Sequence, residues 1–234
     1  MRIGYWLTPT LAFGFAFAAS GQQQPVAPLA KPGDSGPTLA ETMRFIQEKL
    51  SEQGQVAWTE THSNQPGITW RKFATISDVM ADPAACTFYS TATLDTSADL
   101  TKGKIVKMGG KVVTAEDLRI HTVTTATTSA KQIEKITVES LQDVENRSFA
   151  EAAHPEITWT VTPPIFYVRL SASNAVFSAH TSTTTGNQAP VEKDVTVKTG
   201  GITFRDEETA NKVAKAMVHA MELCGGGVTK KEPF

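Results

Sequence analysis

Residues 206–225, DEETANKVAKAMVHAMELCG, are the most regular stretch of the chain and decide how the rest is interpreted. Asp206 is suited to cap a helix, and Glu207 and Glu208 favour the positive end of the helix dipole. Gly225 is a typical helix stop. The apolar residues recur at helical spacing along one face: Ala210, Val213, Ala214, Met217, Met221 and Cys224. We therefore predict a C-terminal helix, Asp206 to Cys224, whose buried face ends in a cysteine.

A second helix is predicted near the other end of the chain. Thr38 followed by Glu41 is a capping-box pattern, and Gly54 is a reasonable stop. Between them the apolar residues Leu39, Met43, Ile46 and Leu50 follow spacings of four, three and four. Such a stripe is typical of a helix that docks on a core.

The region from Gln55 to Phe204 alternates with period two and is rich in Thr, Val, Ile and aromatic residues, which indicates β structure. The predicted strands are Gln55 to His62, Ile68 to Ile76, Cys86 to Leu94, Lys104 to Met108, Lys111 to Thr114, Leu118 to Thr125, Gln132 to Glu139, Ile157 to Thr162, Ile165 to Ser171, Ala175 to Thr183, Val191 to Thr199 and Ile202 to Arg205. Short turns, among them Gly109-Gly110 and Gly200-Gly201, favour antiparallel pairing. The predicted fold class is α+β and mostly antiparallel β, a meander or open barrel packed by an N-terminal and a C-terminal helix.

The threonine runs 122–128 and 181–185 are interpreted as solvent-facing strand residues. Glycan attachment or surface adhesion is the alternative interpretation.

The first residues have the pattern of an export signal. Arg2 precedes an apolar stretch from Tyr5 to Ala19 that ends in small residues. This stretch is shorter than the roughly 20 residues that span a bilayer, which disfavours the alternative of a membrane anchor. We predict a signal peptide over 1–21, a periplasmic or secreted protein, and no transmembrane segment after cleavage.

Domain organisation follows from composition. Residues 22–37 are rich in Gln, Pro, Gly and Ala and are interpreted as a flexible linker. We expect a single β-rich domain over 38–227 and a flexible tail over 228–234. The net charge of −2 gives no electrostatic reason to expect a nucleic acid partner.

The chain has two cysteines, Cys86 and Cys224. Cys86 alternates with Phe88 and Ala92 along a predicted strand, so both cysteines are expected to face the core. An even count in an oxidising compartment predicts a disulfide that fastens the last helix to the sheet. The alternative is two separate buried thiols.

No motif in the sequence predicts a reaction. The histidines lack metal-ligand spacing, and no nucleophile elbow, phosphate loop or calcium loop is present. We therefore predict no catalytic residue, cofactor or metal ligand. A loosely bound Ca²⁺ at the turns that carry Asp78, Asp82, Asp95 and Asp99 is the weaker alternative.

The order of elements resembles pleckstrin-homology-like domains, in which a C-terminal helix plugs an open β-barrel. The resemblance rests on the strand run followed by the helix Asp206 to Cys224, and on Ile136 to Val144 (ITVESLQDV), a strand that enters a turn. The chain departs from the family in its export signal, added N-terminal helix and extra short strands. It also lacks a cluster of basic residues in an early hairpin, so phosphoinositide binding is not expected.

Three functions are compatible with these patterns. The first is a non-enzymatic binding or interaction module of the cell envelope, which contacts an envelope protein or a small apolar ligand. Its candidate contacts are Trp58, Trp70, Trp159, Phe166 and Tyr167, for which core packing is the alternative role. The second is a secreted hydrolase with a site assembled from His121, His180 and nearby carboxylates. The third is a structural or assembly subunit that pairs through exposed edge strands.

Overall fold

The structure is a computed structural model that describes residues 36–101, 106–108, 111–152 and 154–226. The predicted signal peptide, nearly all of the predicted linker, the predicted tail and the Gly109-Gly110 turn lie outside the described residues. The described part is α+β with antiparallel sheets, as the sequence predicts, and its sheets do not close into a barrel.

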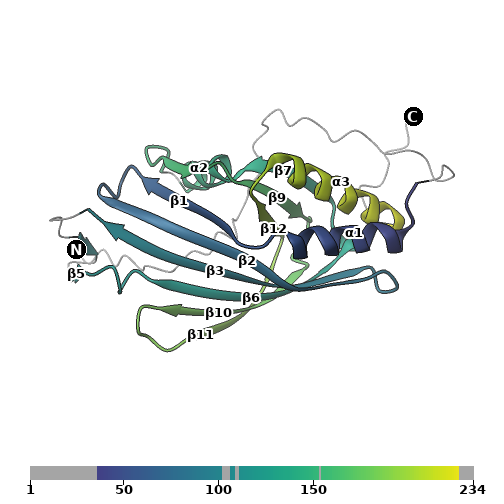
Figure 1. Ribbon diagram of the computed structural model, residues 1–234, viewed down its shortest axis with the longest axis horizontal. Helices are drawn as coiled ribbons and strands as arrows, with labels where there is room; N and C mark the ends of the chain where they lie inside the picture. The colour runs from purple at the N-terminus through teal and green to yellow at the C-terminus, as the bar shows by residue number, and fades with distance from the viewer. Residues whose placement is uncertain (1–35, 102–105, 109–110, 153, 227–234) are drawn as a thin grey trace.

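A seven-stranded sheet forms the larger layer of the molecule (Figure 1). Its strand order is β11-β10-β6-β3-β2-β1-β8, and every neighbouring pair is antiparallel. The strands are β1 (Val56–His62), β2 (Ile68–Asp82), β3 (Thr87–Leu100), β6 (Ile120–Ser129), β8 (Trp159–Thr162), β10 (Phe177–Thr185) and β11 (Val191–Val197). The long strands β2 and β3 extend well beyond the predicted ranges.

A three-stranded sheet faces the large one, in the order β12-β9-β7 (Figure 1). It contains β7 (Lys135–Ser140), β9 (Phe166–Ser171) and β12 (Thr199–Phe204). A short 3-10 helix, η1 (Ala130–Gln132), connects β6 to β7, and β4 (Val106–Met108) pairs with β5 (Lys111–Val113) as a separate hairpin. The chain crosses from the large sheet to the small one at Lys198, between β11 and β12.

The two predicted terminal helices are confirmed as α1 (Leu39–Glu52) and α3 (Glu207–Leu223), which lie side by side at one end of the molecule (Figure 1). The predicted capping box is formed: the Glu41 carboxylate accepts from the Thr38 N–H at 2.8 Å, and Thr38 Oγ1 accepts from the Glu41 N–H at 3.3 Å. Both helices bury their apolar stripes in the main core. Within the described residues, no helix is both long and apolar enough to cross a membrane.

The main core lies where α1 and α3 meet the small sheet and the near end of the large sheet. Its fully buried members include Met43, Ile46, Ile133, Val168, Phe204 and Val213. A disulfide joins Cys86, just before β3, to Cys224 at the C-terminal end of α3, with a Cα separation of 6.0 Å. The predicted disulfide is therefore present, and the alternative of two free thiols is wrong.

A third helix, α2 (Leu141–Glu151), was not predicted. The sequence interpretation placed a strand and then a turn over Ile136 to Val144, whereas the strand ends at Ser140 and a helix begins. Ser140 Oγ accepts from the Asp143 N–H at 3.1 Å and caps this helix. Few apolar residues mark its inner face, so its periodicity is weak and tertiary contacts stabilise it.

The predicted turn at Gly200-Gly201 is also wrong. Both glycines lie within β12, where Gly200 pairs with Leu170 and Gly201 with Arg169 of β9. The missing side chain of Gly201 leaves room for the Tyr167 ring, whereas a Cβ at Gly200 would stand 3.8 Å from Phe177, an ordinary contact distance.

The disulfide gives a prediction on stability. It closes a loop with a sequence separation of 138 residues, so its removal is expected to lower the free energy of unfolding by up to about 5 kcal/mol in the chain-entropy model. Urea unfolding of the protein and of the Cys86→Ser/Cys224→Ser double variant, each with and without reductant, measures this. Reductant should lower the urea midpoint of the parent protein toward that of the variant and leave the midpoint of the variant unchanged. Equal midpoints for all four samples would contradict the prediction.

Candidate functional site: a cavity between the two sheets

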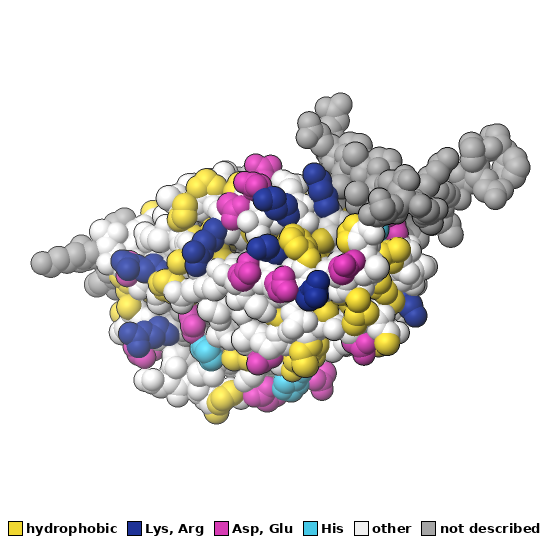
Figure 2. All heavy atoms as spheres, turned by 45° about the vertical axis from the view of Figure 1, so that its right-hand side comes forward, with side chains coloured by type: hydrophobic (Ala, Val, Ile, Leu, Met, Phe, Trp, Pro, Cys, Tyr) yellow, Lys and Arg dark blue, Asp and Glu magenta, His cyan; other side chains and the backbone are white. Residues whose placement is uncertain are grey.

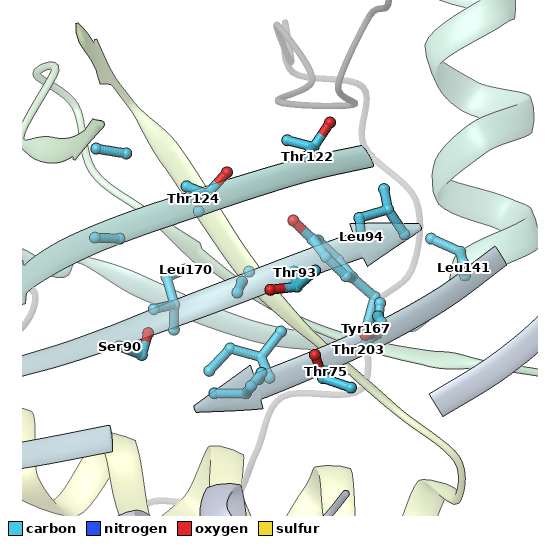
Figure 3. Close-up of a pocket in the computed structure, with 18 of the residues that line it drawn as sticks. Thr75, Ser90, Thr93, Leu94, Thr122, Thr124, Leu141, Tyr167, Leu170 and Thr203 are labelled. Carbon is cyan, nitrogen blue, oxygen red and sulfur yellow. The ribbon is translucent and has the colours of Figure 1, made fainter. Parts of the chain in front are cut away.

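A cavity of about 460 Å³ lies between the inner face of the large sheet and the small sheet. Figure 3 shows side chains from both sheets and from α2 around it. Sites for small molecules commonly have volumes of about 300–1,000 Å³ and mostly apolar walls. The cavity is therefore large enough to hold a small organic molecule.

Alternate residues of β3 and β6 form the floor of the cavity. Ala92 stands opposite Thr124, and Leu94 stands opposite Thr122, so each pair shares the inner face of the sheet. Thr122 is 2% and Thr124 is 7% exposed. The interpretation of the threonine runs as solvent-facing is thus wrong for these alternate members, because the pleat turns every second side chain inward.

Four of the five aromatic residues singled out from the sequence line the cavity. Trp58, Trp70 and Trp159 lie toward the β1–β8 edge of the large sheet, and Tyr167 enters from β9. Phe166 instead packs against the main core. The structure thus brings the three tryptophans and Tyr167 around one space and leaves Phe166 out of it.

Glu60 of β1 is the centre of a buried polar cluster near the same edge. Its side chain is 0% exposed; Trp58 Nε1 donates to Oε1 at 2.6 Å, and Lys72 Nζ lies 2.8 Å from Oε2. His62 Nε2 is 3.6 Å from the same Oε2. Burial by itself would raise the pKa of Glu60, but the His62, Lys72 and Trp58 contacts together hold that pKa below its usual value. Glu60 and Lys72 therefore form a buried ion pair of opposite charges.

Trp159 of β8 lines this end of the cavity and contacts two other rings, those of His62 and Phe149. The His62 ring lies over it with 3.9 Å between centroids, and the Phe149 ring of α2 contacts it at 5.1 Å. Lys72 Nζ lies 5.4 Å from the centroid of the Trp159 ring, within the range of a cation–π contact. The stack fixes the orientation of His62 beside the polar cluster.

Glu145 of α2 is the least satisfied charged group in the cavity. It lies one turn after Leu141 on the inner face of the helix and is only 5% exposed. Its carboxyl has no hydrogen bond or ion pair among the described residues. Burial raises the pKa of Glu145 to about 7; Lys72 opposes this shift and the Glu60 carboxylate adds to it. The group therefore changes charge near neutral pH.

Two side-chain amides of α2 hold this helix on the edge strand β8. Asn146 Oδ1 accepts from the Trp159 N–H at 2.7 Å, and Gln142 Oε1 accepts from the Val161 N–H at 3.1 Å. These bonds satisfy backbone groups that an edge strand would otherwise expose. They also set the position from which Glu145 points into the cavity.

Tyr167 crosses the cavity from the small sheet (Figure 3). Its ring fits because Gly201 has no side chain: a Cβ built there would stand 2.1 Å from Tyr167 Cζ. The Tyr167 hydroxyl has no hydrogen-bond partner within the described part of the chain, and burial raises its pKa to about 12. The hydroxyl is therefore neutral and available to a ligand at neutral pH.

The histidines considered for a hydrolase site do not come together. His121 Nδ1 lies 2.6 Å from Asp95, and His180 Nδ1 lies 2.8 Å from Asp194, each pair exposed on the large sheet. Their positions are four residues apart along the β6–β10 ladder, about 13 Å at the usual strand rise. Neither histidine lines the cavity. In the described ranges, no group of three or more His, Cys, Asp or Glu side chains is placed to hold a metal ion. The aspartates expected at turns, Asp78, Asp82, Asp95 and Asp99, lie instead in β2 and β3.

The sequence contained a signal for part of the polar cluster. In the strand VAWTETH, period two puts Trp58, Glu60 and His62 on the same face as the buried Val56. A glutamate on a core-facing row of a strand is unusual and could have been singled out. Glu145 offered no such signal, because the helix that carries it was not predicted.

Comparisons with protein-family models, with curated proteins and with solved structures each found no match. The pleckstrin-homology-like resemblance thus rests on the order of elements alone, and the site must be interpreted from its own residues.

The close approach of Gly201 and Tyr167 gives a second prediction. Gly201→Ala requires the Tyr167 ring to move, and overpacking of this kind costs about 1–3 kcal/mol. Gly200→Ala is the matched control, since its nearest neighbour is Phe177 Cδ1 at 3.8 Å. Urea unfolding should show Gly201→Ala as clearly the less stable variant; equal stabilities would mean that Tyr167 does not occupy this position.

Glu145 gives a third prediction, on the pH dependence of stability. Because its pKa is about 7 when folded and near 4.3 in an unfolded chain, folding favours the protonated form. The protonated carboxyl of Glu145 therefore adds to the free energy of unfolding below about pH 4, and this contribution is lost as the pH rises toward 7. The free energy of unfolding of Glu145→Gln, taken relative to that of the parent protein, should therefore increase by up to about 3 kcal/mol between pH 4 and pH 8.

Urea unfolding of both proteins across this pH range tests the Glu145 prediction. Glu151→Gln, an exposed change near the end of the same helix, is the control and should keep a constant difference from the parent protein. A constant difference for Glu145→Gln as well would show that Glu145 ionises normally.

Proposed function

We propose that this protein is a non-enzymatic binding module that takes one small, largely apolar molecule into the cavity between its two sheets. The observation that carries the proposal is the cavity of about 460 Å³, whose walls are mostly apolar and hydroxyl-bearing side chains and whose Glu60, His62, Lys72 and Glu145 gather toward one edge. A preformed apolar site with few, placed polar groups is the usual form of a small-molecule site.

We further propose that the protein acts in the periplasm or outside the cell. The disulfide between Cys86 and Cys224 supports this, since such bonds persist in oxidising compartments. The N-terminal export pattern in the sequence points the same way. A disulfide-closed scaffold suits a binding module, because a rigid cavity needs little ordering when a ligand enters.

The two other functions have less support. The hydrolase hypothesis depended on His121 and His180, which lie apart on the exposed face of the large sheet. The assembly hypothesis needs a free edge strand. In the large sheet, Gln142 and Asn146 of α2 bond to β8, which leaves β11 as the edge of that sheet that could pair with another chain; the edges of the small sheet are β12 and β7. On the face shown in Figure 2, basic and acidic side chains are interspersed.

A variant that fills the cavity tests the proposal. Nile red, an uncharged apolar dye, should bind the purified protein saturably at one site with an increase in fluorescence. Ala92→Trp places an indole on the inner face and should weaken this binding at least about tenfold by occupying the space. Thr91→Trp is the matched control, because Thr91 is the preceding residue of β3 and does not line the cavity.

Circular dichroism and thermal unfolding establish that both tryptophan variants are folded. No saturable dye binding, or an equal loss of binding in the two folded variants, would overturn the cavity as the binding site.

A further inference from the structure

We infer that the molecule bound in the cavity carries an ammonium group on an apolar body, and that the Glu145 carboxylate receives this ammonium group. The inference rests on the proposed binding function and names the class of ligand. It starts from a buried carboxyl that points into the cavity and has no partner among the described residues.

The charges near this carboxyl are unbalanced. Glu60 and Lys72 neutralise each other at 2.8 Å, and Glu60 is further satisfied by Trp58 Nε1. Glu145 adds a second carboxyl to the same region, while Lys72, already paired, is the one Lys or Arg among the described residues that lines the cavity. A buried carboxylate needs a positive partner to offset its loss of hydration. A ligand cation would supply it.

Aromatic side chains lie at the same edge of the cavity. Trp58, Trp70 and Trp159 line it there, and Lys72 Nζ already lies 5.4 Å from the centroid of the Trp159 ring. Indole faces attract cations, more strongly where water is excluded. The rings would therefore favour an ammonium head beside Glu145 and repel an anionic one.

A fatty-acid-like ligand fits the site less well. Its carboxylate would lie near both Glu60 and Glu145, and the nearby Lys72 is held by Glu60. Like charges at such close range repel each other, and the repulsion is stronger where water is partly excluded. The apolar walls accept either ligand, so the head group decides between them.

The charge of Glu145 should make binding of an amine depend on pH. The titratable groups that face Glu145 are Glu60 and His62 of β1, Lys72 of β2 and Tyr167 of β9. Glu145 loses its proton near pH 7, whereas an alkylammonium group stays charged below about pH 9, as a lysine does. Affinity for the amine should therefore rise from pH 5.5 to pH 8.

The experiment measures displacement of Nile red from the purified protein by octylammonium, octan-1-ol and octanoate, which each have eight carbon atoms and differ in the head group. At pH 8 octylammonium should bind at least about tenfold more tightly than the other two, the scale of one charge-assisted hydrogen bond. The advantage should shrink at pH 5.5. In Glu145→Gln the ratio of the octylammonium affinity to the octan-1-ol affinity, both measured in this variant, should fall to about one at both pH values.

Each other result has a distinct meaning. Equal or tighter binding of octanoate or octan-1-ol at pH 8 would overturn the ammonium inference and leave the cavity as a binding site. Survival of the amine preference in Glu145→Gln would remove Glu145 from this role and overturn the inference as stated. If Nile red does not bind at all, the proposed function fails and this inference fails with it.

Discussion

A wide sheet covered by a narrow one is the constraint on which the rest of the structure depends. The large sheet has seven strands and the facing sheet has three, so the smaller layer cannot cover the whole inner face. The helices α1 and α3 fill one end with the main core, and the Cys86–Cys224 disulfide fastens α3 there. Toward the β1–β8 edge, the described groups that lie over the large sheet are α2, Ile165 before β9, and Tyr167. The space left between these supports is the cavity.

The polar groups of the cavity follow from the same arrangement. Strand alternation puts Trp58, Glu60 and His62 on the inner face of β1, and Lys72 pairs with Glu60 from the neighbouring strand. Buried charges of this kind are tolerated when each has a partner. Glu145 breaks that rule, because α2 places it against the cavity with no hydrogen-bond or ion-pair partner among the described residues. A residue whose surroundings are unfavourable for its charge, with no evident benefit to the fold, often belongs to a functional site.

The sequence predicted those features that depend on local pattern. The terminal helices, the antiparallel strands and the Cys86–Cys224 bridge follow from capping, periodicity and the even cysteine count. The helix α2 was missed because its inner face has few apolar residues, although Ser140 followed by Asp143 was a capping signal. The strand position of Gly200-Gly201 and the role of Glu145 depend on how the two sheets meet, and such long-range contacts leave no mark in a short stretch of sequence. The threonine runs follow strand alternation, but which of their two faces is covered also depends on the second sheet. Tryptophans were singled out as candidate contacts, but the charged residues between them were not.

The central claim is that a ligand lies between the two sheets, and nuclear Overhauser effects test it most directly. With octan-1-ol at saturation, isotope-filtered spectra would report which methyl groups lie close to the ligand chain. The account predicts contacts to the inner-face methyl groups of Ala92, Thr122 and Thr124. Contacts confined to outer-face methyl groups, such as those of Thr91 and Thr125, or none at all, would contradict it.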